Sequence, residues 1–370
     1  MSLLQHLQSV KDPRIARARR HDFQSILFIA LSATIAGADN WVEVAQFAQL
    51  HKDWFARLVP LPSDIPSHDT FARVFRLLDA LQLEQSCQQW LMQVAGQVQG
   101  TVAIDGKAVR GSRKGDVHRA LHMVSAWAAD MGLLLGQRKV DGKSNEITAI
   151  PELLRLLHLK GCIVTIDAIG CQKDIARQLH EHGADYVLSL KDNQPHMHAV
   201  VQKHFEQHKM TAQECNMYTE SSKNHGRQEV RCYAVAGVPA ALERAAAHWP
   251  GLSSVVQVKR WRQQTGKDAS QEISYYLSSL PAHTGADVFA HSIRAHWSVE
   301  NQLHWSLDVA MREDAAPLYK DQGAHNQSLF RRMALQLLNN DTTVKVGVQA
   351  KRKRAGWNLN YLAQVLGITI

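Results

Sequence analysis

The chain has 370 residues, 45% of them hydrophobic and 21% charged, a balance that fits two or three globular domains and excludes a disordered or low-complexity protein. Lys and Arg outnumber Asp and Glu by 42 to 34, a net charge of +8, so nucleic acid or another anionic surface is a plausible partner. The longest early apolar run, residues 26–38, has 13 residues, whereas a membrane span needs about 20.

Cysteine usage bears on the cellular compartment. The five Cys are an odd number and include no CxxC pair, which argues against a disulfide framework or a Cys-rich zinc site and favours a reducing cytosol. The N-terminal residues lack the apolar core of a signal peptide. No GxxxxGK[ST] loop occurs, so no nucleotide cofactor is expected. The shortness of the early apolar run means that no membrane is expected either.

The first hundred residues have helical patterns. Residues 23–36 are predicted to form an apolar helix, and a second helix starts at Asn40 and runs to Leu50. A Pro-rich connection leads to Ser67, which begins a good helix start with Ser67 or Asp69 as the N-cap. A further helix is expected at 83–98.

At residue 101 the pattern changes to that of an α/β core. The expected elements are strands at 101–105, 121–129 and 133–140, a helix at 144–159, a strand at 162–167, a helix at 172–182 and a strand at 185–190. The later two strands are too apolar to be half exposed, so both of their faces should be buried.

The remaining chain combines a β-rich insertion with C-terminal helices. Its expected elements are a helix at 196–208, strands at 228–234, 254–261 and 272–278, a long helix at 286–311 and another at 326–339. A basic run, Lys351-Arg352-Lys353-Arg354, lies near the C-terminus.

Two acids stand at the ends of buried strands, Asp105 after TVAI and Asp167 after CIVTI. A carboxylate there is costly unless it is paired or binds a metal, although each Asp could simply cap the following turn. Strand ends also form the crevice where α/β sheets bind ligands. Two such acids in one sheet of a basic protein favour a metal site, because a cation between them would relieve their repulsion.

A third acid, Glu300, lies in the long helix beside a buried stripe of apolar residues. His296, Glu300 and His304 follow at i, i+4 and i+8, on one helix face. This spacing fits a Glu metal ligand flanked by His that contact DNA or support the site. It also fits a zinc face or a solvated helix face.

These segments resemble a known family. AIDGKAVRGS around Asp105, TIDAIGCQ around Asp167 and HWSVENQLHWSLDVAMRED around Glu300 are similar to the DDE transposases of bacterial insertion sequences. The closest likeness is to the ISAs-type group, which includes the H-repeat-associated proteins. DPRIARARRHDFQSILFIALSATIAGADNW, HGRQEVRCY and HNQSLFRRMALQLL also resemble segments of that group.

The resemblance implies an RNase H-like mixed-sheet core in which Asp105, Asp167 and Glu300 converge as the catalytic and metal-binding acids. It implies two Mg²⁺ or Mn²⁺ ions, one activating water or a DNA 3′-hydroxyl and the other stabilising the leaving oxygen. The implied partners are element terminal repeats, target DNA and a second copy of the chain in a homodimer. The implied location is the bacterial cytoplasm, at the nucleoid when DNA is bound.

One departure affects the cleavage route. Related hairpin-forming transposases carry Tyr, Arg and Lys around the helix Glu, where this chain has Ile293, His296 and Leu307. Hairpin formation therefore stays open. Trp297 is present and could stack on an unpaired base.

Further residues are candidates for DNA contact, each with a solvated or structural role as the alternative. They are Lys107, Arg110, Arg113, Lys114, His225, Arg227, Arg294, His296, Trp297, Lys351, Arg352, Lys353 and Arg354.

The sequence predicts four regions. These are a helical DNA-binding domain at 1–98, a catalytic core at 99–195 plus 285–345, a β-rich insertion at 196–284 and a basic C-terminal tail at 346–370. The predicted function is DNA strand cleavage and strand transfer at insertion-sequence ends. The alternatives are a degenerate DNA-binding protein without catalysis and a metal-dependent nuclease outside transposition.

Overall fold

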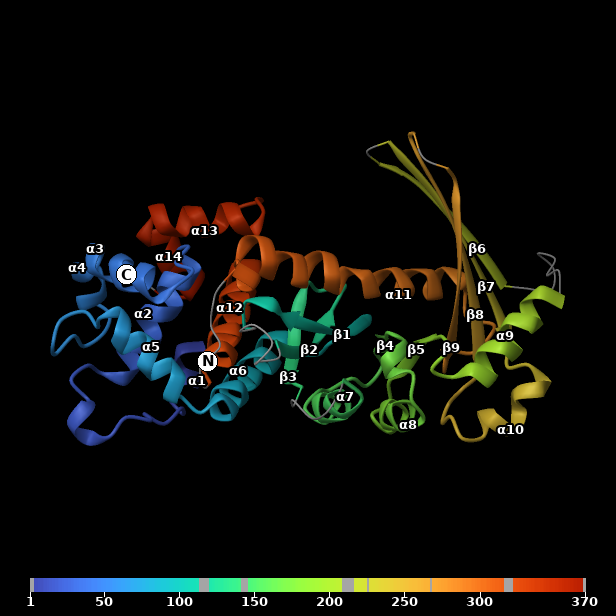
Figure 1. Cartoon of the computed structure of the whole chain (residues 1–370), viewed down its shortest axis with the longest axis horizontal. Coiled ribbons are helices and arrows are strands. Elements are labelled where there is room, and N and C mark those ends of the chain that lie inside the picture. Colours follow the sequence, from blue (N-terminus) through green and yellow to red (C-terminus); the bar gives the residue numbers. More distant parts are fainter. Residues whose placement is uncertain are drawn as a thin grey trace.

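A single nine-stranded sheet organises the chain. The computed structural model describes residues 3–112, 120–140, 146–207, 216–224, 226–266, 268–315 and 322–368. The strand order is β3-β2-β1-β4-β5-β9-β8-β7-β6. Figure 1 shows a helical lobe at one end of the long axis, the sheet core in the middle and a projecting β-arm at the other end.

The core half of the sheet has an RNase H-like order. Its strands are β1 (Thr101–Val109), β2 (Leu121–Ala128), β3 (Leu133–Lys139), β4 (Ile163–Ile166) and β5 (Asp185–Leu190). The first three are antiparallel neighbours, whereas β4 pairs in parallel with both β1 and β5. The expected hairpin is present, and Gly132 supplies its turn with a φ of 64°. The predicted α/β class and mixed sheet are confirmed.

Helices cover the two faces of this core differently. The lower face in Figure 1 carries α7 (Glu146–Leu154) and α8 (Lys173–Glu181), and the opposite face carries α11 (Ala286–Ser298). Successive side chains of a strand point to opposite faces of the sheet, so each face packs against different helices. Val102 and Ile104 pack in the cluster with α7 and α8, whereas Ala103 packs with residues of the helical lobe.

The β-arm extends the same sheet. Its strands are β6 (Asn216–Asn224), β7 (Arg227–Gly237), β8 (Ser254–Gln264) and β9 (Ser270–Ser278), joined antiparallel to one another. β9 also pairs with β5, which makes the arm continuous with the core. The helices α9 (Pro195–Gln207) and α10 (Glu243–Ala246) lie beside it. The strand β6 was not predicted, because its segment is polar and lacks a clear alternating pattern.

The helical lobe is built from both ends of the chain. Its N-terminal helices are α1 (Leu3–Leu7), α2 (Phe23–Ile35), α3 (Trp41–Leu50), α4 (Lys52–Ala56), α5 (His68–Leu77) and α6 (Ala80–Ala95). Its C-terminal helices are α12 (Gly323–Asn340), α13 (Val348–Trp357) and α14 (Leu359–Leu366). Residues of both groups share one buried apolar cluster. Ser67, one of the two predicted caps, caps α5, and Asn40, where a helix is expected to start, caps α3, since each side chain accepts a backbone N–H.

Two predicted helices have clearly different boundaries in the structure. The helix expected at 83–98 is α6, which starts earlier because Asp79 caps it and ends at Gly96, where φ is 57°. The helix expected from Ser144 to Leu159 ends at Leu154, and its predicted start lies outside the described residues. No helix in the described ranges is both long and apolar enough to cross a membrane.

Candidate active site

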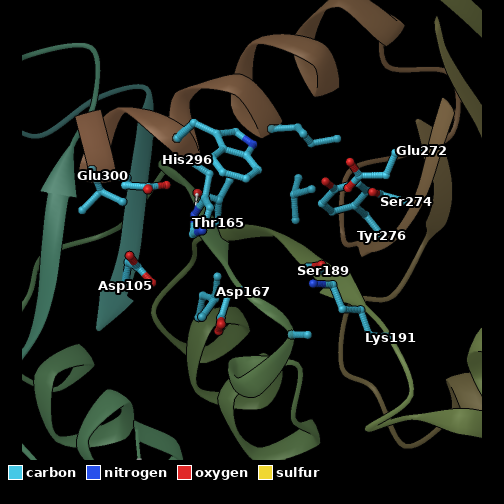
Figure 2. Close-up of a pocket in the computed structure, with 16 residues that line it drawn as sticks. Asp105, Thr165, Asp167, Ser189, Lys191, Glu272, Ser274, Tyr276, His296 and Glu300 are labelled. Carbon is cyan, nitrogen blue, oxygen red and sulfur yellow. Dashed lines mark hydrogen bonds between the residues drawn. The ribbon is translucent and has the colours of Figure 1, made fainter. Parts of the chain in front are cut away.

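The three predicted acids line one cavity of about 250 Å³ at the centre of the sheet. Figure 2 shows Asp105, Asp167 and Glu300 around this cavity, contributed by β1, the end of β4 and the long helix. The cavity therefore collects carboxylates from segments that are far apart in the sequence.

Strand geometry directs Asp105 to the cavity. Asp105 is two residues beyond Ala103 on β1, so the two side chains share the face that packs against the helical lobe. The parallel pairing of Ile104 with Ile166 brings Asp105, in the middle of β1, level with Asp167, which directly follows the end of β4. The adjacency of these strands is the feature that the resemblance implied.

Asp167 also has a capping role. Its carboxylate accepts backbone N–H bonds from Ile169 and Gly170, which starts the short helix η3 (Ala168–Gly170). One oxygen, Oδ1, takes both bonds. The capping alternative is therefore correct for part of this carboxylate, and Oδ2 is left for another partner.

Glu300 lies where the long helix changes its winding. The α-helical turns of α11 end at Ser298, and π-helical turns follow in η5 (Val299–His304) and η6 (Ser306–Ala310). Such turns are rare and recur at functional sites. Val299 and Leu303 are buried beneath them while Glu300 is exposed toward the cavity. One turn earlier, the Nδ1 of His296 lies 3.1 Å from the Thr165 hydroxyl on β4.

The carboxylates are held in an electrostatically crowded place. Burial raises the pKa of Asp105 to about 7, and the negative charges of Asp167, Glu146 and Glu300 add to the rise. Burial also raises the pKa of Asp167, with Glu146 contributing and Lys191 opposing. A raised pKa means that the protein as it stands disfavours the ionised acids, which a divalent cation would favour.

The donor set fits Mg²⁺ or Mn²⁺. Asp105, Asp167 and Glu300 offer only carboxylate oxygens, which these ions prefer, whereas zinc sites favour His and Cys. In the described ranges no three His, Cys, Asp or Glu side chains lie close enough together to surround an ion. The three acids therefore line the cavity without forming a closed ligand set.

The two His beside Glu300 are poor cations. Burial lowers the pKa of His296 to about 4, and burial with the charges of Arg332 and Lys107 lowers the pKa of His304 to about 3. The Nδ1 of His304 lies 3.5 Å from Asp105 Oδ2. Neutral imidazoles do not hold phosphates by charge, so His296 contributes a hydrogen bond to β4 rather than an electrostatic grip.

Lys107 was predicted to contact DNA, but the structure places its ammonium group in an internal cluster of carboxylates. Its side chain is only 7% exposed, and its Nζ lies 2.7 Å from Asp308 and 3.2 Å from Asp314. The fully buried Glu313 is 3.6 Å away. Lys107 therefore neutralises a carboxylate cluster that links β1 to the segment after Glu300.

The other predicted DNA residues fall in different places. Arg110 is 85% exposed at the end of β1. Arg227, Arg294 and Trp297 line a second cavity on the β-arm, and Trp297 lines the first cavity as well. Arg113, Lys114 and His225 lie outside the described residues.

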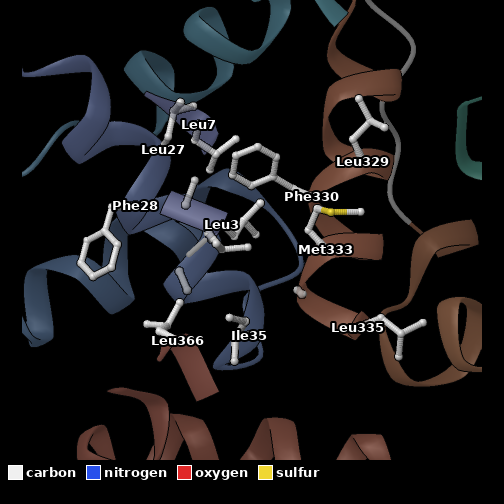
Figure 3. Packing of buried hydrophobic residues seen from close by; sticks show 14 of the residues in the cluster. Leu3, Leu7, Leu27, Phe28, Ile35, Leu329, Phe330, Met333, Leu335 and Leu366 are labelled. Atoms are coloured by element: carbon white, nitrogen blue, oxygen red, sulfur yellow. The ribbon is translucent and has the colours of Figure 1, made fainter. Parts of the chain in front are cut away.

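The sequence predicts a phosphate-binding patch or a solvated tail for the basic C-terminal run, and neither fits its first two residues. Lys351 and Arg352 are buried in α13, where they donate to backbone carbonyls that include Leu338 and Thr34. Lys353 and Arg354 are exposed. Figure 3 shows Leu366 of α14 packed near Leu3 and Ile35, so this part of the chain completes the helical lobe.

Sequence reasoning missed a fourth acid near the site. Glu146, the first described residue of α7, accepts a 2.6 Å hydrogen bond from His122 Nε2. A Cβ at Gly106 would collide with both side chains, so glycine next to Asp105 leaves the room that this pair occupies. In the sequence, Ser144-Asn145-Glu146 indicates only the start of a helix, so nothing in it predicts that Glu146 lies near Asp105.

Comparison with known proteins decides the family. Residues 96–337 match the family model described as "Transposase DDE domain", and residues 4–91 match the one described as "DDE_Tnp_1-associated". The chain belongs to the DDE transposase family. The first match spans well over half of the chain and includes Asp105, Asp167 and Glu300.

Similar proteins are known over nearly the full length of this DDE transposase-family chain. "Putative transposase YncI" of Escherichia coli O157:H7 is 38% identical over 369 residues, which cover 99% of this chain and 94% of the relative. "H repeat-associated putative transposase YhhI" of Escherichia coli K12 is 36% identical, with 98% and 97% covered. "Inactive transposase YbfQ" of the same strain is 33% identical over 72 residues, covering 20% of this chain and 86% of the relative.

Family membership confirms the resemblance and the RNase H-like core. It also implies DNA as the partner and a general dependence on divalent metal. These statements hold for the DDE transposase family as a whole.

Proposed function

We propose that this chain cleaves and joins DNA strands at insertion-sequence ends, with Asp105, Asp167 and Glu300 as its metal-binding catalytic acids. The observation that carries the proposal is the meeting of these acids, from three separate elements, around one cavity. The raised pKa of Asp105, caused by burial and neighbouring carboxylates, supports a role in holding cations.

The chain's own residues would place the DNA. The three carboxylates mark the position of the scissile phosphate, and the exposed Trp297 lies one turn before Glu300. When bound, divalent ions supply Lewis-acid activation of the nucleophile and stabilise the leaving oxygen. In hydrolysis, water oxygen bonds to phosphorus, the bond to the 3′-oxygen breaks, and a 3′-hydroxyl and a 5′-phosphate result.

Joining reuses the same arrangement. The freed 3′-hydroxyl attacks a target phosphate, one phosphodiester bond forms as another breaks, and the displaced oxygen takes up a proton. Both steps need an activated oxygen nucleophile in line with a leaving oxygen, so one carboxylate set can serve both.

The helical lobe is the proposed reader of the element ends. Its support is the separate family match over residues 4–91 and the exposure of Arg17 and Arg20, which can contact phosphates. We propose a homodimer that holds two ends together. Sedimentation with and without terminal-repeat DNA tests this part, and a single subunit on each DNA would exclude the dimer.

The main test is nicking and joining of DNA that carries the flanking repeat, in Mg²⁺, Mn²⁺ or EDTA, by wild type and Asp105→Ala. Metal-dependent products from wild type alone support the proposal. Nicking without joining favours a nuclease outside transposition. DNA binding by both proteins without any cleavage favours a degenerate, catalytically inactive binder.

A further inference from the structure

A second cavity, of about 420 Å³, continues the candidate active site along the β-arm. It lies between the arm and the α11–η5 helix, and Arg227, Arg231, Arg260, Arg262 and Arg294 line it. We call it the arginine cleft. Both cavities share lining residues, among them Ile293, Trp297 and Tyr276, so one groove runs from the acids into the cleft.

Strand alternation builds the floor of the arginine cleft. Arg227 and Arg231 on β7 are separated by an even number of positions, as are Arg260 and Arg262 on β8. The arginines of each strand therefore lie on one face of the sheet. Arg231 is directly opposite Arg260 in the sheet register. Two cations opposite each other destabilise a sheet, so this pairing needs a compensating charge or ligand.

Carboxylates supply only part of that compensation. Glu229, 3% exposed, lies within 3.7 Å of Arg227 and Arg262 and pairs closely with Arg231. Arg260 pairs with Glu272, while Glu220 lies 2.9 Å from Arg294. Five guanidiniums therefore face three carboxylates, which leaves a net charge of +2. Because Glu229 is buried, it holds guanidiniums in place before any ligand arrives.

The junction of the two cavities favours an unpaired strand as the ligand. Trp297 lines both cavities and is 52% exposed, so part of its side chain is accessible at their junction. Bases stack on such rings only when they have left the duplex. Guanidinium forks bind phosphates in a bidentate manner. Proteins that bind single-stranded nucleic acid combine an aromatic ring for base stacking with a row of basic side chains for the phosphates.

We infer that the arginine cleft binds the phosphate backbone of an unpaired DNA strand next to the scissile bond, with a base stacked on Trp297. The inference deepens the proposed function and rests on it for the identity of the ligand as DNA. The arginines at its core, Arg231, Arg260 and Arg262, were not among the residues that the sequence singled out.

The test is the salt dependence of binding to a fluorescent single-stranded oligonucleotide, measured by anisotropy in EDTA. The main variant is Arg260→Gln with Glu272→Gln, which removes one ion pair and leaves the net charge unchanged. Removing a single arginine–phosphate interaction should reduce the slope of log K against log salt by about 0.7. The matched control is Arg177→Gln with Asp174→Asn, an exposed pair on α8 across the sheet, which should leave the slope unchanged.

A second variant, Arg262→Gln, lies farther out on the arm. It should also reduce the slope, so the inference stays testable if the first variant fails to fold. Unchanged slopes in both variants would overturn the inference. An equal weakening of blunt duplex would also overturn it, because the cleft would then not select an unpaired strand. Binding is measured in EDTA, which prevents cleavage, and nicking is assayed separately in Mg²⁺ or Mn²⁺. A slope that depends on the arginines, together with no nicking in metal, would support the cleft and reject the catalytic proposal. Nicking with wild-type slopes in both variants would do the reverse.

Discussion

Replacing Lys107 with Met should destabilise the protein and leave DNA binding intact. The Lys107 ammonium is 7% exposed and faces Asp308, Glu313 and Asp314 at 2.7, 3.6 and 3.2 Å. The variant leaves these carboxylates without their shared cation. Since β1 also carries Asp105, the cluster ties the strand of one proposed catalytic acid to the segment that follows Glu300.

The size of the effect follows from burial. Removing one partner of a buried pair costs about 3–5 kcal/mol. Asp308 and Asp314 are 37% and 26% exposed and can regain water, so we expect a loss of about 2–3 kcal/mol in the free energy of unfolding. Urea unfolding followed by tryptophan fluorescence measures it.

Arg110→Met is the matched control for Lys107→Met. Arg110 follows shortly after Lys107 but is 85% exposed, so its loss should change the free energy of unfolding by no more than about 0.5 kcal/mol. The salt slope of DNA binding should be the same for Lys107→Met and wild type. A normal unfolding midpoint combined with a reduced slope would refute the reasoning, because Lys107 would then be a phosphate ligand.

Three further substitutions test separate parts of the structure. Gly106→Ala should cost about 1–3 kcal/mol in urea unfolding, because the added methyl meets Glu146 and His122, and Glu146→Ala in the same chain should restore part of the loss. Arg352→Met should cost about 3–5 kcal/mol without altering the salt slope of DNA binding, since this buried side chain bonds internal groups; wild-type stability would contradict its structural role. Trp297→Ala should keep the unfolding midpoint and weaken single-strand binding by about 1–3 kcal/mol, and unchanged affinity would exclude stacking on this ring.

Local patterns single out the three carboxylates as candidates, and their catalytic roles stay predictions. Asp105 and Asp167 end apolar runs that predict buried strands, although β1 continues past Asp105 to Val109, and Glu300 lies beside the stripe of Val299 and Leu303. The adjacency of β1 and β4 came from the family resemblance, because strand order depends on long-range pairing that no local pattern contains. The division of the chain into four regions stays a prediction.

Charge was the least predictable property. Lys107 looked like a phosphate ligand because its partners, Asp308, Glu313 and Asp314, lie some two hundred residues later in the chain. For Lys351 the sequence likewise predicts a phosphate-binding patch or a solvated tail, because helix α13 and the carbonyls that this side chain bonds are tertiary features.

The β-arm shows the same limit. The arginines of β7 and β8 meet only through strand register, and Arg231 and Arg260 are 29 positions apart in the chain yet directly opposite in the sheet. Alternation along one strand can be predicted from sequence, whereas the partner across the sheet depends on where the strands begin and turn.

The central claim is that Asp105, Asp167 and Glu300 together hold the divalent ions. The most direct measurement is Mn²⁺ binding followed by the electron paramagnetic resonance signal of the free ion, with a single-stranded oligonucleotide present. Wild type and the exposed control Asp174→Asn should deplete free Mn²⁺ equally, and Asp105→Asn, Asp167→Asn and Glu300→Gln should each lose that depletion. Mn²⁺ binding at the wild-type level by any of these three variants would contradict the account.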